Sequence, residues 1–320
     1  MTRSSKVLPL FLICILLQGA GLPGAGLAQQ LPADQPELSA TAEHDDTDPS
    51  VALTGTVWRT KPGIVFLKTP VGLLTLSSKS TLKDMRASQE VRFWIHGSSM
   101  VVDIRKRADG SLLHRYLTGP VARGADDPKS LRQWTPEGEA AFRYGSHEAQ
   151  LSALPDGDPV TVEVDDTGTI TGIHDLQFDL QIGQLPASGS EAHVLLNGTV
   201  SKLKSNFIFF RTPVGVVNVN AKIGIKNAKV GQTMKLHIHH HTAAADLTPA
   251  NGTAPTRRFI TGPLEFSTAE RTGVKLWTPE GEQSFPTDRG KAALTGAKEG
   301  SPITVELNGE GAVVDIHRLN

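Results

Sequence analysis

The chain has 320 residues, a formal net charge of −1 and a single cysteine, Cys14. Cys14 lies in an N-terminal segment that we expect to be removed, so the mature chain would contain no cysteine. Disulfide bonds, thiolate metal sites, haem attachment through cysteine and cysteine nucleophiles are thereby excluded. The stability of the fold must then come from the burial of apolar side chains.

Residues 1–28 have the order of a secretory signal peptide. Arg3 and Lys6 precede an apolar run from residue 7 to about 17, and small residues lead to a cleavage site after Ala28. A membrane anchor is the alternative, but this run is well short of the ~20 residues that span a bilayer. We therefore predict export to the periplasm or the extracellular space, with no transmembrane segment in the mature chain.

Residues 29–50 follow as an acidic segment. They include six Asp or Glu, three prolines and no Lys or Arg. Low apolar content with a high net charge is typical of disordered chain. We interpret this segment as an acidic disordered tether that precedes the folded part.

The folded part contains a duplication with an offset of 143 residues. The hexapeptide Trp-Thr-Pro-Glu-Gly-Glu (WTPEGE) occurs at 134–139 and again at 277–282. Repeats of this length predict two similar structural domains. We place the domains at 51–177 and 195–320, joined by a linker at 178–194.

Each domain divides again into two units of roughly 60 residues, because Thr-Pro-x-Gly recurs once in every unit. Pro and Gly at these positions predict a hairpin turn. Short stretches rich in Val, Ile, Leu and aromatic residues lie between the turns and predict strands. The sequence thus predicts an all-β protein of four tandem small five-stranded barrels. In the first unit the expected strands cover 55–59, 64–68, 73–76, 91–96 and 100–105.

Five strands with a short helix after the third resemble the OB-fold. The runs Gly55-Thr56-Val57, Thr69-Pro70-Val71-Gly72 and Val230-Gly231-Gln232 are similar to tandem OB-fold-like small exported bacterial β-barrel repeats of unassigned function. This resemblance covers residues 52–320 and implies a fold without implying a reaction. An SH3-like barrel or a β-sandwich would give a similar pattern.

Basic and acidic units alternate along the chain. Residues 51–117 carry 11 Lys or Arg against 4 acids, whereas 118–177 carry 4 against 11. Residues 195–260 carry 9 against 1, and 261–320 carry 6 against 9. Because a unit of about 60 residues is marginal alone, we expect each basic unit to pack against its acidic neighbour. The tryptophan of each WTPEGE copy is expected at that seam.

The basic units supply the main candidate site. Six cations could form a face for an anionic polymer, such as an envelope polysaccharide, in the way that OB barrels bind oligosaccharides and oligonucleotides. Solvation, or pairing with the acidic units, is the simpler interpretation of the same residues. Nucleic acid is disfavoured, because stacking aromatics are sparse and export removes most such targets. The six residues are Lys61, Lys68 and Arg92 in the first domain and Lys202, Lys204 and Arg211 in the second.

A histidine cluster supplies the first alternative function. On an extended strand, His237, His239 and His241 would lie on one face, and imidazoles bind Zn, Cu or Ni. The chain would then be a periplasmic metal-binding protein. A solvent-exposed strand end that is rich in histidine is the simpler interpretation, and no other cofactor is expected.

The carboxylates of WTPEGE supply the second alternative, a carbohydrate-active enzyme. Glu137 with Glu139, and Glu280 with Glu282, are paired acids of the kind that glycosidases use. Alternation along a strand would instead place each pair on one solvated face. The sequence also lacks the usual hydrolase, metalloprotease and phosphate-loop motifs. We therefore predict a non-enzymatic binding or scaffold protein of the cell envelope.

Overall fold

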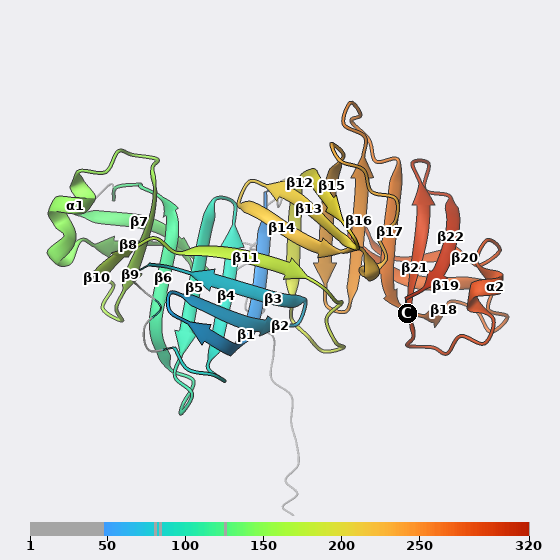
Figure 1. Ribbon diagram of the computed structural model, residues 1–320, viewed down its shortest axis with the longest axis horizontal. Helices are drawn as coiled ribbons and strands as arrows, with labels where there is room; N and C mark the ends of the chain where they lie inside the picture. Colours follow the sequence, from blue (N-terminus) through green and yellow to red (C-terminus); the bar gives the residue numbers. More distant parts are fainter. Residues whose placement is uncertain (1–47, 80–81, 83–84, 125–126, 320) are drawn as a thin grey trace, which may run out of the picture. The chain divides into compact units, whose positions relative to one another are not determined.

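The computed structural model describes residues 48–79, 82, 85–124 and 127–319 (Figure 1). The predicted signal peptide at 1–28 and nearly all of the predicted tether at 29–50 lie outside these residues. In the described ranges, no helix has the length and apolar character that crossing a membrane requires.

Strands dominate the structure, which confirms the all-β prediction. They form because inward and outward residues alternate: Val65, Leu67 and Thr69 are buried on β2, while Lys68, between Leu67 and Thr69, is exposed. The elements of the first domain are β1 (Ser50–Lys61), β2 (Ile64–Thr69), β3 (Gly72–Ser77), β4 (Glu90–His96), β5 (Ser99–Arg105), β6 (Leu112–Pro120), β7 (Ser130–Thr135), β8 (Gly138–Arg143), the 3-10 helix η1 (Gly145–His147), α1 (Glu148–Ser152), β9 (Pro159–Val164), β10 (Ile170–His174) and β11 (Gln177–Ile182).

The second domain repeats the order of β1 to β10 at an offset of 143 residues, as the starts of β1 at Ser50 and β12 at His193 show, with η2 and β18 as added elements. β11 has no counterpart among the described residues of the second domain. The elements are β12 (His193–Lys204), β13 (Phe207–Thr212), β14 (Gly215–Asn220), η2 (Ala221–Ile223), β15 (Thr233–His239), β16 (Thr242–Thr248), β17 (Arg257–Pro263), β18 (Glu265–Phe266), β19 (Gly273–Thr278), β20 (Gly281–Pro286), α2 (Lys291–Leu294), β21 (Pro302–Asn308) and β22 (Val313–Arg318).

Each Thr-Pro-x-Gly sequence closes a hairpin in the same way. The Thr hydroxyl donates a hydrogen bond to the Gly carbonyl at 2.7–3.0 Å in all four copies. The four glycines have positive φ between 113° and 143°, where a side chain is strained. The sequence repeats these residues because the turn needs both the hydroxyl and the glycine.

The strands do not separate into four sheets of five. Among the described residues, 17 strands belong to one sheet, and the remainder form a three-stranded and a two-stranded sheet. The units merge because β6 pairs with β5 and also with β9, and β17 pairs with β16 and also with β21. The predicted boundaries after residues 117 and 260 therefore fall inside continuous strands.

The segment 178–194, which we expected to be a linker, contains most of β11. β11 pairs antiparallel with β3 and parallel with β14, so within the large sheet it connects strands of the two domains (Figure 1). β1 also pairs with β12 at Ser50–Ala52. The pairings β1–β2–β3–β11–β14–β13–β12–β1 consequently form a closed circuit.

The hydrophobic core follows this circuit. Buried side chains of both basic units, 51–117 and 195–260, belong to one cluster, with Leu67 and Phe210 among its fully buried members. The acidic units have smaller clusters of their own. Opposite charge therefore does not decide all of the packing between units, because the two basic units also pack against each other. The cations of the basic units lie on the outer faces of their strands, so the apolar inner faces of the two units can pack together.

Candidate functional site

The first candidate site lies on the β1–β2 hairpin, where exposed cations surround two aromatic rings. The Arg59 guanidinium lies 4.6 Å from the Phe66 ring centroid and 5.3 Å from that of Trp58. Lys68 Nζ lies 5.5 Å from the Trp58 centroid. The register of β1 against β2 shifts at Trp58, and this bulge leaves both Trp58 and Arg59 exposed. We call Trp58, Arg59, Lys61, Phe66 and Lys68 the first cationic face.

The second cationic face occupies the corresponding positions of β12 and β13. Lys202 and Phe209 are register partners, as Arg59 and Phe66 are in the first domain. Lys202 Nζ lies 5.7 Å from the Phe209 centroid. The second cationic face consists of Lys202, Lys204, Phe209 and Arg211.

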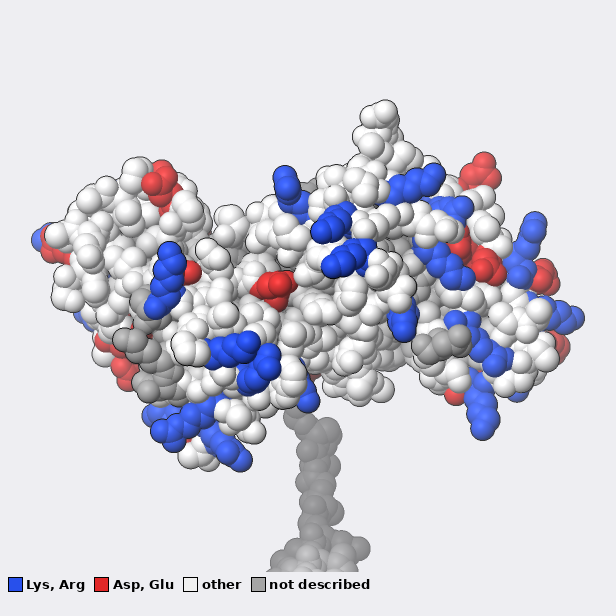
Figure 2. Space-filling view, viewed as in Figure 1, with Lys and Arg blue, Asp and Glu red and all other residues white. Residues whose placement is uncertain are grey.

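The cations of both faces are exposed and none forms an ion pair within the described part of the chain. In the view of Figure 2, Lys and Arg side chains gather over the regions that Figure 1 labels β1 to β3 and β12 to β14. Arg92 is different, because it lies on β4 and its Nε contacts Glu90 Oε1 at 2.8 Å. Arg59 was not among the cations expected from the sequence, although it lies two residues before Lys61 and 143 before Lys202.

The two faces belong to one outer sheet surface. Lys68 pairs with Leu73 on β3, which pairs with Gln181 on β11. Gln181 in turn pairs with Asn218 on β14, the register partner of Phe209 on β13. Four strand spacings of about 4.8 Å give a path of roughly 19 Å along the sheet between Lys68 and Phe209.

The WTPEGE motif fastens an acidic unit to a basic one. Trp134 on β7 stacks on His96 of β4, with ring centroids 4.9 Å apart and an interplanar angle of 16°. In the second domain Trp277 stacks on His239 of β15 at 4.9 Å and 28°. Each tryptophan thus lies between the units, as the sequence predicted.

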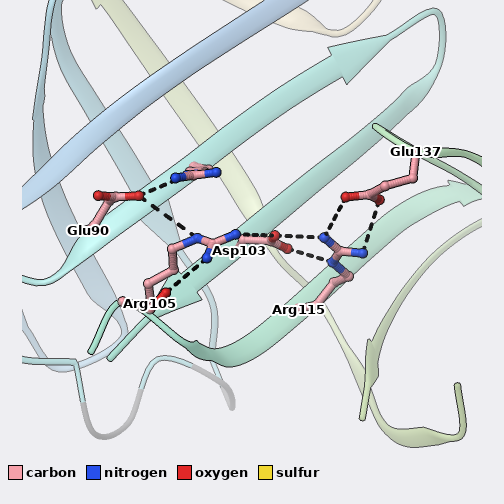
Figure 3. A network of polar contacts seen from close by, with 7 residues as sticks. Glu90, Asp103, Arg105, Arg115 and Glu137 are labelled. Carbon is pink, nitrogen blue, oxygen red and sulfur yellow. Dashed lines mark hydrogen bonds and ion pairs between the residues drawn. The ribbon is translucent and has the colours of Figure 1, made fainter. Parts of the chain in front are cut away.

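An ion-pair network holds the turn of the first WTPEGE copy (Figure 3). Arg115 donates two hydrogen bonds of 2.8 Å to the buried Asp103, and it donates two longer bonds to Glu137. Hydrogen bonding to Asp103 raises the pKa of Arg115. Burial opposes ionisation of Glu137, but hydrogen bonds and the charge of Arg115 lower its pKa overall.

The second domain repeats the network with equivalent residues. Arg258 contacts Asp246 Oδ1 at 2.6 Å and Glu280 Oε2 at 2.9 Å. Glu282, the remaining acid of that copy, contacts Lys275 at 3.0 Å. The WTPEGE carboxylates therefore face cations of the protein, an arrangement that serves attachment of the turn.

The histidines do not line one strand face as expected. β15 ends at His239, and His240 and His241 form the two-residue turn that pairs His239 with Thr242. His240 has a positive φ of 49°, which breaks the alternation that would place His241 beside the others. In the described ranges, no group of three or more His, Cys, Asp or Glu is arranged to hold a metal ion.

The remaining two histidines pack around a tryptophan. The ring centroid of His237 lies 4.9 Å from that of Trp277, and His193 of β12 lies 5.3 Å from His237. Burial lowers the pKa of His239, and the charge of His240 lowers it further. The cluster is therefore an aromatic packing surface around Trp277, in which burial favours the neutral form of His239.

A further titratable group lies on β6, β9 and β10. Glu163 lies 2.6 Å from His114 Nδ1 and 3.1 Å from His174 Nε2. Hydrogen bonds from His114 and then His174 lower the pKa of Glu163 to about 2. Sequence reasoning missed this group because its members are separated along the chain and meet only through strand pairing.

No family model matches the chain, and no curated protein matches it.

Proposed function

We propose that the chain is an exported, non-enzymatic binding or scaffold protein of the cell envelope that holds an anionic polymer on its two cationic faces. The observation that carries this proposal is the repetition of three exposed cations without ion pairs among the described residues at positions 143 apart, Arg59, Lys61 and Lys68 and then Lys202, Lys204 and Arg211, with at least one cation of each set over a phenylalanine ring. An anionic polysaccharide is the preferred class of ligand. We also propose that the units are related to the OB-fold; the pairing of β1 with both β2 and β4 supports this proposal.

Free cations on a sheet surface attract a polyanion without requiring a closed pocket. The rings of Phe66 and Phe209 fix the neighbouring ammonium and guanidinium groups through cation–π contacts, each worth about 0.5–1 kcal/mol at an exposed site. This ordering reduces the entropy that the side chains lose when a ligand binds. The two cationic faces therefore hold their charges in positions that suit a ligand with repeated anionic groups.

The distance between the faces favours a long ligand. A chain that crosses roughly 19 Å of sheet engages both faces at once, and the second contact becomes intramolecular. A short oligosaccharide reaches one face only. We expect affinity to rise with chain length until both faces are occupied.

The test uses the mature protein, with heparin as the probe. The variant Lys202→Gln/Lys204→Gln/Arg211→Gln should elute from a heparin column at lower salt than the unchanged protein. The slope of log affinity against log salt should also fall in magnitude by roughly two, if polyanion contacts behave as in nucleic-acid complexes.

The matched control removes the same charge elsewhere. Lys129, Lys226 and Lys275 each contact an acid of the protein at 2.8–3.8 Å. Changing these three lysines to Gln should leave heparin elution nearly unchanged. Equal losses in both triple variants would show that only net charge matters and would overturn the assignment to the cationic faces.

A further inference from the structure

A cavity of 640 Å³ lies beside the segment that follows β11. Leu185 and Pro186 of that segment, Ile223 of η2, Pro302 of β21 and Leu319 supply apolar walls. The volume is within the range of about 300–1,000 Å³ that is usual for small-molecule sites. The cavity is thus large enough to hold a compact organic molecule.

Two polar side chains of the cavity are without partners. His241 Nδ1 is buried and has no hydrogen-bond partner in the described part of the chain. Lys222, which is exposed, forms no ion pair with any described residue. A buried polar atom without a partner is destabilising and calls for a ligand or solvent to satisfy it. None of the residues lining the cavity is acidic.

The first domain provides an internal comparison. Lys79 and Ser98 occupy the positions of Lys222 and His241, 143 residues earlier. The cavity beside Lys79 is lined by Asp175, which accepts a hydrogen bond from the Lys79 backbone N–H at 3.0 Å. A carboxylate at that point repels anions, so the two domains differ in the charge that they offer to a ligand.

We propose that the cavity of the second domain binds a small molecule with an apolar body and a single anionic group, such as a medium-chain carboxylate. The apolar body occupies the walls of Leu185, Pro186 and Ile223. The anionic group faces Lys222, and it accepts a hydrogen bond from His241 Nδ1 once the imidazole ring turns this buried atom toward the cavity. This site is separate from the cationic faces and does not depend on the binding of a polymer.

The probe is octanoate, measured by isothermal titration with the mature protein, and octanol serves as the neutral match. Octanoate should bind about tenfold more tightly than octanol, because a charge-assisted hydrogen bond contributes about that factor. Lys222→Gln should remove this preference, and Lys222→Arg should retain it. His241→Phe keeps an aromatic ring without the nitrogen and should weaken octanoate more than octanol.

Lys79→Gln is the matched control and should leave octanoate binding unchanged. Equal affinities for octanoate and octanol, or equal effects of Lys79→Gln and Lys222→Gln, would overturn the proposal. Absence of octanoate binding at millimolar concentration would overturn it as well. Heparin binding should persist in the presence of octanoate, so failure at this site is distinguishable from failure of the polymer proposal.

Discussion

Arg115 connects two carboxylates whose contributions to stability should differ severalfold. The Asp103 side chain is 0% exposed and the Arg115 side chain 19%, whereas the Glu137 side chain is 66% exposed. Loss of one partner from a buried ion pair costs about 3–5 kcal/mol, but an exposed pair contributes about 0–1 kcal/mol. Arg115 keeps Glu137 when Asp103 is changed, so the lower end of the first range applies.

Asp103→Asn should therefore lower the free energy of unfolding by about 3 kcal/mol, and Glu137→Gln by less than about 1 kcal/mol. Urea unfolding followed by tryptophan fluorescence measures both values under the same conditions. Asp246→Asn offers a second comparison, because the Asp246 side chain is 13% exposed and its loss should cost less than that of Asp103. Equal losses for Asp103→Asn and Glu137→Gln would refute the reasoning from burial.

Three further predictions concern other parts of the molecule. A Cβ at Gly72 would lie 2.2 Å from the Gln181 carbonyl oxygen, whereas one at Gly215 would meet nothing within 4 Å. Gly72→Ala should thus destabilise the protein in thermal unfolding by about 1–3 kcal/mol more than Gly215→Ala, and equal shifts would contradict the pairing of β11. Because the pKa of Glu163 is lowered to about 2 from 4.5, its stabilisation is present above pH 4.5 and is lost as the pH falls toward 2. Glu163→Gln should lower the free energy of unfolding at pH 7 and should weaken its dependence on pH between about 2 and 4.5. An unchanged dependence on pH would contradict a stabilising role for the contacts of Glu163 with His114 and His174. The pKa of His239 lies below 6.5, so the free energy of unfolding should decrease as the pH falls below 6.5. His239→Tyr should make this decrease smaller when unfolding is followed by fluorescence at a series of pH values. A decrease as large as that of the unchanged protein would contradict the prediction.

The sequence by itself predicted the local features of this protein. Alternation of apolar and polar residues identified strands such as β2, and the Thr-Pro-x-Gly repeats located hairpin turns, because both depend on neighbouring residues. The repeated Trp134 and Trp277 predicted a contact between units, since a large ring present only in the acidic units needs a partner surface. The sequence also identified the cations of the two cationic faces, apart from Arg59.

The tertiary structure alone decided how these pieces combine. A strand edge can pair with any other edge of suitable length, so nothing local showed that β11 would join β3 to β14 within the expected linker. The positive φ of 49° at His240 places His241 in a turn beside a cavity instead of on the strand face. The meeting of Glu163 with His114 and His174 likewise depends on the register of separate strands. Local periodicity specifies which side of a strand is buried, but long-range pairing specifies which strands and side chains meet.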